Sequence, residues 1–285
     1  MKKLFSIVLA ALMVAALFAG CGSSTAETKA PETTAAPAAA ETTAAPAETE
    51  APAETEAAAT FTTIEAGKLI MSTNAAFPPY EMVADDGSFE GIDVEIAGAV
   101  AAKLGLELVV DDMDFDAALL AVQQGKSDIV MAGVTVNEDR KMVMNFSDTY
   151  AKGVQVVIVK EGSDVTMDNL GEKQIGTQRG TTGYIYTSGD YGEDHVTAYD
   201  NGASAVQALM NGQVDCVVID SAPAEAFVEA NPGLTILDTE YTSEDYAIGM
   251  SKDNTALLDA VNAALAELTA DGTIPAIVEK YIPTK

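Results

Sequence analysis

The sequence predicts an α/β fold built on largely parallel sheets, and three observations point to it. From Phe61 to Lys285, short apolar runs alternate with segments whose apolar residues recur at helical spacing. Strands that alternate with helices in this way are typical of parallel sheets covered by helices. This part of about 225 residues is also long enough for two modest lobes or one large domain.

The first half begins with a predicted strand at Leu69–Met71. The next residues, Asn74–Tyr80, form a loop because two prolines keep it out of the helical region. An amphipathic helix is predicted from Asp93 to Leu104, where Gly105 ends it. The remaining elements predicted in this half are the strand Glu107–Val110, the helix Asp116–Gln124 and the strand Asp128–Met131.

The second half repeats this order. Its predicted strands are the apolar runs Gln155–Val159, Gln174–Gly176, Val196–Tyr199 and Val214–Ile219. Its predicted helices are Gly180–Tyr186, Ala203–Asn211, Pro223–Glu229, Thr255–Thr269 and Ile274–Tyr281.

The N-terminus predicts export and lipid attachment. Lys2 and Lys3 precede an apolar run from Leu4 to Phe18, and small residues then lead to Cys21. This order resembles that of a lipoprotein signal peptide, which would comprise residues 1–20. Phe18 departs from the pattern, because lipoprotein signals have an aliphatic residue three positions before the cysteine. The alternatives are a transmembrane helix, which needs about 20 apolar residues, and ordinary cleavage near residues 24–26.

Residues 21–60 predict a lipidated cysteine followed by a disordered tether. From Gly22 to Thr60 the chain uses almost only Ala, Thr, Glu, Pro, Ser and Gly. Such a segment has no apolar surface to offset the entropy of ordering, so we expect an extended leash that precedes the folded part.

Composition narrows the partners. A net charge of −29 argues against nucleic acid, whose phosphates require clustered Lys and Arg. If Cys21 carries lipid, Cys216 has no disulfide partner, and its apolar surroundings predict a buried, inert thiol. With His195 as the single histidine, the sequence predicts no metal site, no cofactor and no nucleophile with an orienting histidine.

Three motif-like segments fail the tests of their motifs. Gly125–Ser127 ends a predicted helix, whereas a phosphate-binding loop must precede one. Asp112–Asp116 has the alternating acids of a calcium loop but lacks its glycine and its final glutamate. Gly202–Val206 lacks the last glycine of a nucleophile elbow. The sequence therefore shows no set of catalytic residues for hydrolysis.

Chemically distinctive residues instead follow the predicted strands. In open parallel sheets, ligands bind at the carboxyl ends of the strands, where loops and helix N-termini converge. The loops that lie at such ends here are 74–81, 113–115, 132–140, 178–183 and 219–221.

The motifs along the chain resemble those of one family. FPPYE, GIDVEIA, MDFDAALLAVQQGKSDIVMAG, VTVNEDRK, NFSDTY, IGTQRGTTG, VDCVVIDSAP and DYAIGM stand in the order and spacing of the solute-binding proteins of polar amino acid ABC importers. The resemblance covers essentially Phe61 to Lys285. It implies a two-lobe periplasmic-binding-protein-like clamshell, with residues 61–152 and 249–285 in lobe 1, 153–248 in lobe 2, and crossings near Tyr150–Gln155 and Glu244–Ile248.

The resemblance also implies roles for single residues. Arg140 matches the arginine that grips the α-carboxylate of the ligand, helped by Thr135 and the amides of Thr181 and Thr182, and Asp220 matches the acid that takes the α-ammonium. Ala132 and Gly133 lie in the loop whose carbonyl assists, while Phe77, Phe115 and Tyr80 match aromatic walls. Asn74 departs from the acid often found there, and it and Gln178 leave the side-chain specificity open.

Each assignment has a plainer alternative. Arg140 could form only a surface ion pair with the acids before it, Asp220 could merely cap the following helix, and Phe77 and Phe115 could be ordinary core. Arg179 and His195 are expected to be solvated.

The predicted function is extracytoplasmic capture of a polar amino acid by a lipid-anchored, monomeric binding protein on the outer face of the bacterial membrane. It would deliver the ligand to an ABC permease without chemistry on it. The alternatives are a dehydratase-like enzyme on the same scaffold and a sensory domain. An enzyme would need a positioned acid or base, for which the loops offer Asp220 and the more remote Glu81.

Overall fold

The structure, a computed structural model, describes residues 61–238 and 240–283. These residues all belong to one compact unit. The predicted signal peptide, Cys21 and the tether of residues 21–60 lie outside the described residues. Within the described ranges, no helix combines the length and the apolar content needed to cross a membrane.

One group of parallel strands comes from the first half of the chain. Strand β1 (Lys68–Thr73) pairs in parallel with β5 (Glu107–Asp112) on one side and with β6 (Ile129–Val130) on the other. Leu69 to Thr73 are buried, as expected of a central parallel strand that helices cover on both faces.

A second parallel group comes from the second half. Strand β8 (Ile175–Gln178) lies between β10 (Cys216–Asp220) and β9 (Val196–Tyr199), in parallel with both. All residues of β10 are buried, so the run that contains Cys216 is a core strand.

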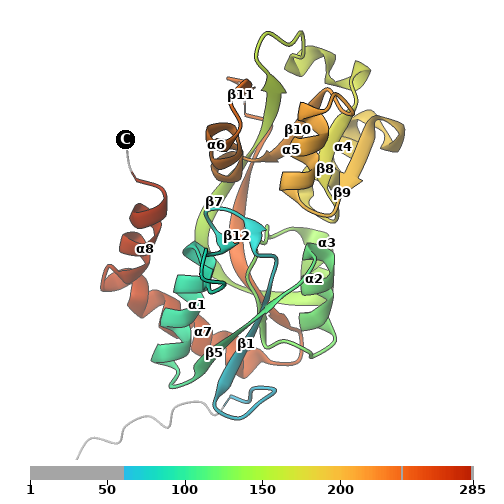
Figure 1. Ribbon diagram of the computed structural model, residues 1–285. Helices are drawn as coiled ribbons and strands as arrows, with labels where there is room; N and C mark the ends of the chain where they lie inside the picture. Colours follow the sequence, from blue (N-terminus) through green and yellow to red (C-terminus); the bar gives the residue numbers. More distant parts are fainter. Residues whose placement is uncertain (1–60, 239, 284–285) are drawn as a thin grey trace, which may run out of the picture. The chain divides into compact units, whose positions relative to one another are not determined.

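Two long antiparallel strands join the groups into one sheet, whose order is β5-β1-β6-β12-β7-β10-β8-β9. Strand β7 (Met144–Lys160) has 17 residues and spans about 55 Å at about 3.3 Å per residue. It pairs with β12 (Thr242–Ser251) along its first part, and with β10 and the short β11 (Leu234–Ile236) along its last. Figure 1 shows β7 and β12 running from the group with β1 and β5 to the group with β8 and β10. This is the mixed α/β, two-lobe architecture that the sequence predicted.

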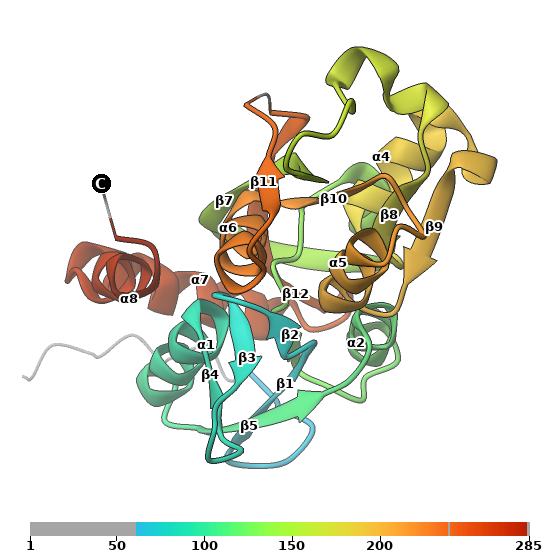
Figure 2. The ribbon, with the colours of Figure 1, turned by 45° about the horizontal axis from the view of Figure 1, so that its top comes forward.

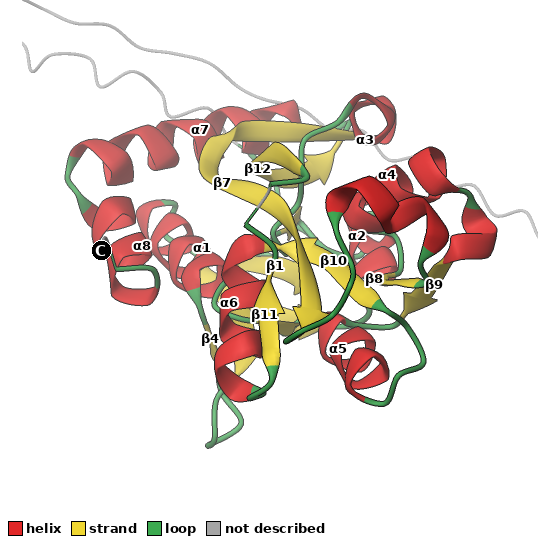
Figure 3. Ribbon diagram, turned by 90° about the horizontal axis from the view of Figure 1, so that it is seen from above, coloured by secondary structure: helices red, strands yellow, loops and turns green. Residues whose placement is uncertain are grey.

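Helices flank both groups of strands (Figure 3). They are α1 (Ile92–Lys103), α2 (Phe115–Gln123), α3 (Glu138–Val143), α4 (Thr182–Tyr191), α5 (Gly202–Met210), α6 (Ser221–Ala230), α7 (Thr255–Ala270) and α8 (Thr273–Tyr281), with 3-10 turns at Met167–Glu172 and Glu193–His195. Helices α1, α7 and α8 contact one another (Figure 2), so the end of the chain packs beside its first helix.

The structure adds elements that the sequence analysis did not predict. The loop after β1 contains the small antiparallel sheet β2 (Ala76–Phe77), β3 (Glu81–Val83) and β4 (Phe89–Glu90). Helix α3, strand β11, the first part of β7 and all of β12 were also missed. The first part of β7 alternates irregularly between buried and exposed residues, so it lacks the apolar run that revealed the core strands.

Candidate functional site

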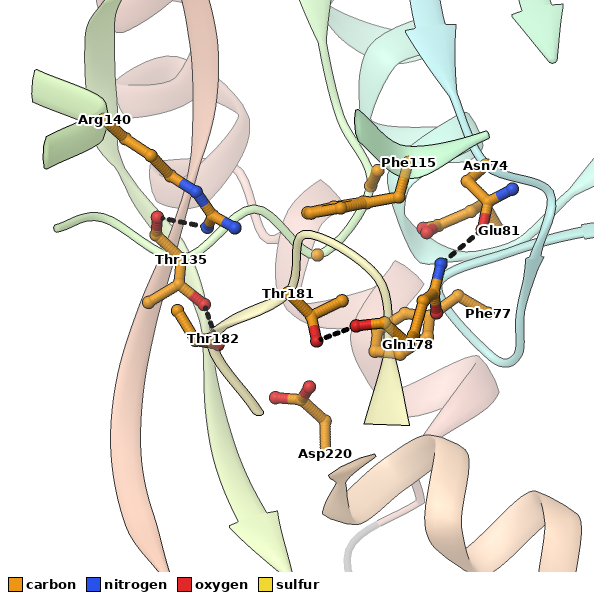
Figure 4. A pocket seen from close by; sticks show the side chains of 12 residues that line it. Asn74, Phe77, Glu81, Phe115, Thr135, Arg140, Gln178, Thr181, Thr182 and Asp220 are labelled. Carbon is orange, nitrogen blue, oxygen red and sulfur yellow. Dashed lines mark hydrogen bonds between the residues drawn. The ribbon is translucent and has the colours of Figure 1, made fainter. Parts of the chain in front are cut away.

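The carboxyl ends of four strands meet at one pocket (Figure 4). Its walls come from the residues that follow β1, β6, β8 and β10 and from the starts of α2, α3 and α4. They are Asn74, Phe77, Glu81, Phe115, Ala132, Gly133, Thr135, Arg140, Gln178, Thr181, Thr182 and Asp220. The structure therefore brings together every predicted site residue except Tyr80.

Arg140 is a buried cation held in place by its helix. The Asn137 side chain caps α3 and accepts a hydrogen bond from the Arg140 amide at 2.8 Å. The guanidinium is 7% exposed and donates to the carbonyls of Thr135 at 2.8 Å and Gly180 at 3.1 Å. It also lies 5.4 Å from the centre of the Phe115 ring. The alternative of a surface ion pair is therefore wrong, and burial lowers the pKa of Arg140.

Asp220 ends β10 and is also 7% exposed. It occupies the N-cap position of α6, but its side chain makes no capping hydrogen bond. Instead its carboxylate accepts hydrogen bonds from the Tyr246 hydroxyl and from Gln155 Nε2, the latter at 2.8 Å. Burial, with the nearby Glu244 carboxylate, raises the pKa of Asp220 to about 7.

A hydrogen-bonded chain connects Asp220 to the loop that precedes Arg140. Gln155 Nε2 of β7 also donates to Glu244 Oε2 of β12 at 2.9 Å, and the same oxygen accepts from Thr135 Oγ1 at 3.0 Å. The sequence analysis assigned no role to Gln155, Tyr246 or Glu244. They orient the pocket from the two long strands without lining it.

The start of α4 contributes backbone donors. Thr181 is the N-cap residue of this helix, and its amide donates to the Gln178 carbonyl at 3.4 Å, whereas Thr182 is the first helical residue. The first amides of a helix have no partner inside it and carry partial positive charge, which suits a carboxylate. The Thr182 hydroxyl lies 3.4 Å from that of Thr135, so these amides are close to the Arg140 loop.

The rest of the pocket wall consists of side-chain amides, aromatic rings and backbone groups. Gln178 Nε2 donates to Asn74 Oδ1 at 2.9 Å, and Asn74 Nδ2 donates to the Met113 carbonyl at 2.9 Å. Gly133 has φ +54°, and an added Cβ there would collide with the Phe77 ring. Phe77 and Phe115 belong to the buried clusters as well as to the pocket, so the core and pocket interpretations both hold.

Tyr80 does not line the pocket, which corrects its prediction as an aromatic wall. It is buried behind Phe77, with ring centres 5.9 Å apart, and packs edge-on against Tyr246 at 5.3 Å. The next residue, Glu81, lines the pocket instead. Tyr80 is the last residue of the turn between β2 and β3, whereas Glu81 is the first residue of β3, so the two side chains point in different directions.

The pocket is too small for an amino acid in this conformation. Its cavity volume is about 10 Å³, which is roughly the space for one water molecule. Entry of a larger ligand therefore requires its walls to move apart.

Cys216, Arg179 and His195 lie outside the pocket. Among the described residues, no group of three or more His, Cys, Asp or Glu side chains is arranged for a metal ion. Cys216 is buried, and burial raises the pKa of its thiol to about 12. Arg179 is exposed beside Asp200, as expected, while His195 is half-buried near the Lys173 carbonyl.

The fold defines a class of protein, the two-lobe binding proteins, and this chain has a pocket where its strands end. The chain belongs to the bacterial extracellular solute-binding proteins, family 3, whose model matches residues 69–284. The relatives that resemble this chain are named as amino-acid-binding proteins, which favours the binding-protein interpretation over the dehydratase-like alternative.

Similar proteins cover the folded part. The ABC transporter arginine-binding protein 1 of Escherichia coli is 29% identical over 80% of this chain and 96% of its own length. An L-cystine-binding protein of Escherichia coli is 30% identical over 76% and 83%. The solved structure of an ancestral arginine-binding protein bound to glutamine is 38% identical, covers 76% of this chain and 99% of that one, and has a TM-score of 0.73.

Proposed function

We propose that the protein captures a polar amino acid outside the cytoplasm and delivers it to the permease of an ABC importer. The observation that carries the proposal is the pair Arg140 and Asp220, two buried and opposite charges in the wall of one pocket. A free amino acid has one carboxylate and one ammonium to match them. The names of the relatives, which bind arginine and cystine, support a ligand of this kind.

We propose the same roles for the wall residues that the family resemblance implies. Arg140 holds the α-carboxylate, together with Thr135 and the amides at the start of α4. Asp220 holds the α-ammonium, and the Gly133 carbonyl assists it. Phe77, Phe115, Asn74 and Gln178 surround the side chain, and Ala132 completes the wall next to Gly133.

The ligand would close two lobes around itself. We assign residues 61–152 and 249–285 to lobe 1 and 153–248 to lobe 2, so that Arg140 and Asp220 belong to different lobes. A ligand that contacts both lobes binds the closed form better than the open one, and only such a difference can shift the equilibrium. The small cavity supports this proposal because entry needs the walls to separate.

The remaining proposals concern location. Residues 1–20 would be removed as a signal peptide, Cys21 would carry the lipid, and residues 21–60 would tether a monomeric domain to the outer face of the membrane. The family description, extracellular, supports the location outside the cytoplasm.

A calorimetric screen of the natural amino acids tests the function. We expect saturable binding of at least one amino acid with a neutral or cationic polar side chain, such as glutamine, cystine, histidine or arginine. Small-angle scattering at saturating ligand should show a more compact protein. Tightest binding of glutamate or aspartate would refute the ligand class, and binding without compaction would refute lobe closure.

A further inference from the structure

Glu81 is a buried acid in the pocket wall whose one described side-chain partner is another buried acid, Asp93. Glu81 is 0% exposed, its carboxylate oxygens accept no hydrogen bond from a described neutral or cationic donor, and with Asp93 it can only share a proton. Because a charge buried without a partner is costly, such a group either binds a proton or finds a cation. Burial, followed by the nearby Asp93 carboxylate, raises the pKa of Glu81 well above its usual range.

The buried charges of the described chain are out of balance around this residue. Its fully or nearly buried acids are Glu81, Asp93, Asp128, Asp220 and Glu244, whereas its one buried cation is Arg140. Asp128 accepts hydrogen bonds from the amides of Ile64 and Ile70, away from the pocket. The Arg140 guanidinium is engaged by two carbonyls and by the Phe115 ring.

A zwitterion alone cannot remove this imbalance. Its carboxylate pairs with Arg140 and its ammonium pairs with Asp220. Because the zwitterion is neutral overall, no positive charge is left to pair with Glu81. A neutral ligand side chain would leave Glu81 protonated, and an acidic one would add another negative charge. A positive ligand side chain is the component that completes the site.

We propose that Glu81 is the specificity-determining residue of this pocket, and that it binds a cationic side chain of the captured amino acid. The proposal rests on the proposed function and narrows its ligand class to amino acids with a guanidinium or ammonium group. Glu81 and Asp93 together supply the negative charge, and Asp93 is fixed because its Oδ2 accepts the Gly133 amide at 2.9 Å.

The surrounding wall suits a cation with several donors. Gln178 Oε1 is a second buried acceptor without a partner among the described residues, and it belongs to the same wall as Glu81. The Phe77 ring offers a face to a cation, and a planar guanidinium uses such a face well. With five N–H donors, a guanidinium could satisfy these acceptors at once.

Binding should also change the protonation of Glu81. The groups that influence it come from several elements, and each of them is an acid or a phenol: Asp93 of α1, Asp112 of β5, Asp220 of β10, Tyr80 before β3 and Tyr150 of β7. None supplies a positive charge. A cationic ligand should therefore lower the pKa of Glu81 and expel its proton, whereas a neutral ligand of the same shape should not.

Arginine and citrulline provide the matched test, because citrulline replaces the guanidinium with a neutral ureido group of nearly the same shape. Calorimetry in buffers of different ionisation enthalpy, from about pH 5 to about pH 8, gives both affinity and proton release. We expect arginine to bind roughly 100-fold more tightly than citrulline near neutral pH. Arginine should release more protons than citrulline somewhere in this range, and its advantage should shrink as the pH falls. Any proton that the α-ammonium displaces from Asp220 is common to both ligands and cancels.

Glu81→Gln tests the residue itself. It should reduce the preference for arginine to less than about tenfold and abolish the difference in proton release, while citrulline binding persists. Glu90→Gln, the same change at an exposed position of β4, should leave both quantities as in the parent protein.

The outcomes separate this inference from the proposed function. Equal affinity for arginine and citrulline, or equal proton release throughout the pH range, overturns the role of Glu81 even if Glu81→Gln does not fold. Glutamine binding with no cationic preference leaves the proposed function standing and refutes this inference alone. Failure of every amino acid to bind refutes both.

Discussion

The two acids of the pocket wall, Asp220 and Glu81, are similarly buried but differently supported. Asp220 accepts hydrogen bonds from Tyr246 and Gln155, which belong to the two long strands β12 and β7. Glu81 has no such neutral donor among the described residues and can only share a proton with the Asp93 carboxyl group. The Asp220 carboxylate is thus oriented before a ligand arrives, whereas the Glu81 carboxylate depends on what the ligand brings.

This difference corresponds to two kinds of recognition. All free amino acids share the α-ammonium and the α-carboxylate, so the groups that hold them can be fixed by the protein itself. The side chain varies, and buried acids without a cation favour a ligand that supplies the missing positive charge. The Asp220 end should therefore set affinity for amino acids in general, and the Glu81 end should choose among them.

The largest expected loss of affinity follows substitution of Arg140 or Asp220, the residues proposed to hold the α-carboxylate and the α-ammonium. Arg140→Met or Asp220→Asn leaves one ligand charge buried without its partner, which typically costs about 3–5 kcal/mol. Affinity for the best ligand should fall by about two to four decades. Calorimetry measures the loss, and thermal melts without ligand establish that each variant folds.

Arg179→Met is the matched control for these variants. Arg179 follows β8 beside the same loop, but its side chain is exposed and pairs with Asp200 at 3.7 Å. The Arg179→Met variant should bind the best ligand with the same affinity as the parent protein. If it loses as much as the other two, or if Arg140→Met binds like the parent, the pocket has been assigned wrongly.

A smaller effect should follow when the support of Asp220 is displaced. A Cβ on Gly153 would collide with the Tyr246 hydroxyl and with Asp220 Oδ1. We expect Gly153→Ala to cost about 1–3 kcal/mol through overpacking and to weaken arginine and citrulline binding by the same factor. Gly189→Ala meets no atom within 4 Å and should leave both affinities unchanged, while its place inside α4 should raise the melting temperature slightly. A change in selectivity at Gly153→Ala would mean that the two ends are not separate.

The pH dependence sharpens the comparison further. Because the pKa of Asp220 is raised to about 7, its carboxylate loses its charge as the pH falls through 7, and affinity even for a neutral amino acid should fall with it.

The stability of the ligand-free domain should change in the opposite sense. A raised carboxyl pKa means that the folded state binds more protons than the unfolded state, so the free energy of unfolding should rise as the pH falls from about 7 towards 4. Titration calorimetry checks the trend in affinity, and denaturant melts check the trend in stability. If the affinity of Asp220→Asn stays constant below pH 7, the pH dependence of binding is due to Asp220. A ligand-free stability that decreases over the same interval would contradict the raised pKa.

The smallest effect on binding should come from the proposed anchor. Cys21→Ala should release the protein from the membrane while leaving affinity unchanged, because the substitution lies some forty residues before the fold. Lipid attachment holds stably through two or more acyl chains, whereas one chain binds marginally. Membrane fractionation after a salt wash checks this. A variant that still sediments with membranes would refute the anchor at Cys21.

The core strands and most helices could be predicted from the sequence, because buried strands such as Cys216–Asp220 contain apolar runs. Val196–Tyr199, which is not a core strand, also has the predicted bounds. Only the end of β7 was predicted and none of β12, because parts of these long strands are polar and half-exposed. Their lengths depend on pairing with each other, which no local pattern contains.

The pocket wall was predictable because ligand residues follow strand ends, and the family resemblance supplied their positions. The exchange of Tyr80 for Glu81 was not predictable, because it depends on the conformation of the turn that joins β2 and β3. The support of Asp220 by Gln155 and Tyr246 joins residues 65 and 26 positions away in the sequence. Only the folded chain brings such polar pairs together.

A double-mutant cycle tests the central claim most directly, that Arg140 binds the α-carboxylate of an amino acid inside this pocket. The best natural ligand and its α-amide, which lacks the carboxylate charge, are titrated against the parent protein and Arg140→Met. If the claim holds, the amide binds the parent roughly 100-fold or more weakly, and the variant hardly distinguishes the two ligands. An amide that loses the same factor against both proteins would contradict the claim, because the carboxylate would then be held elsewhere.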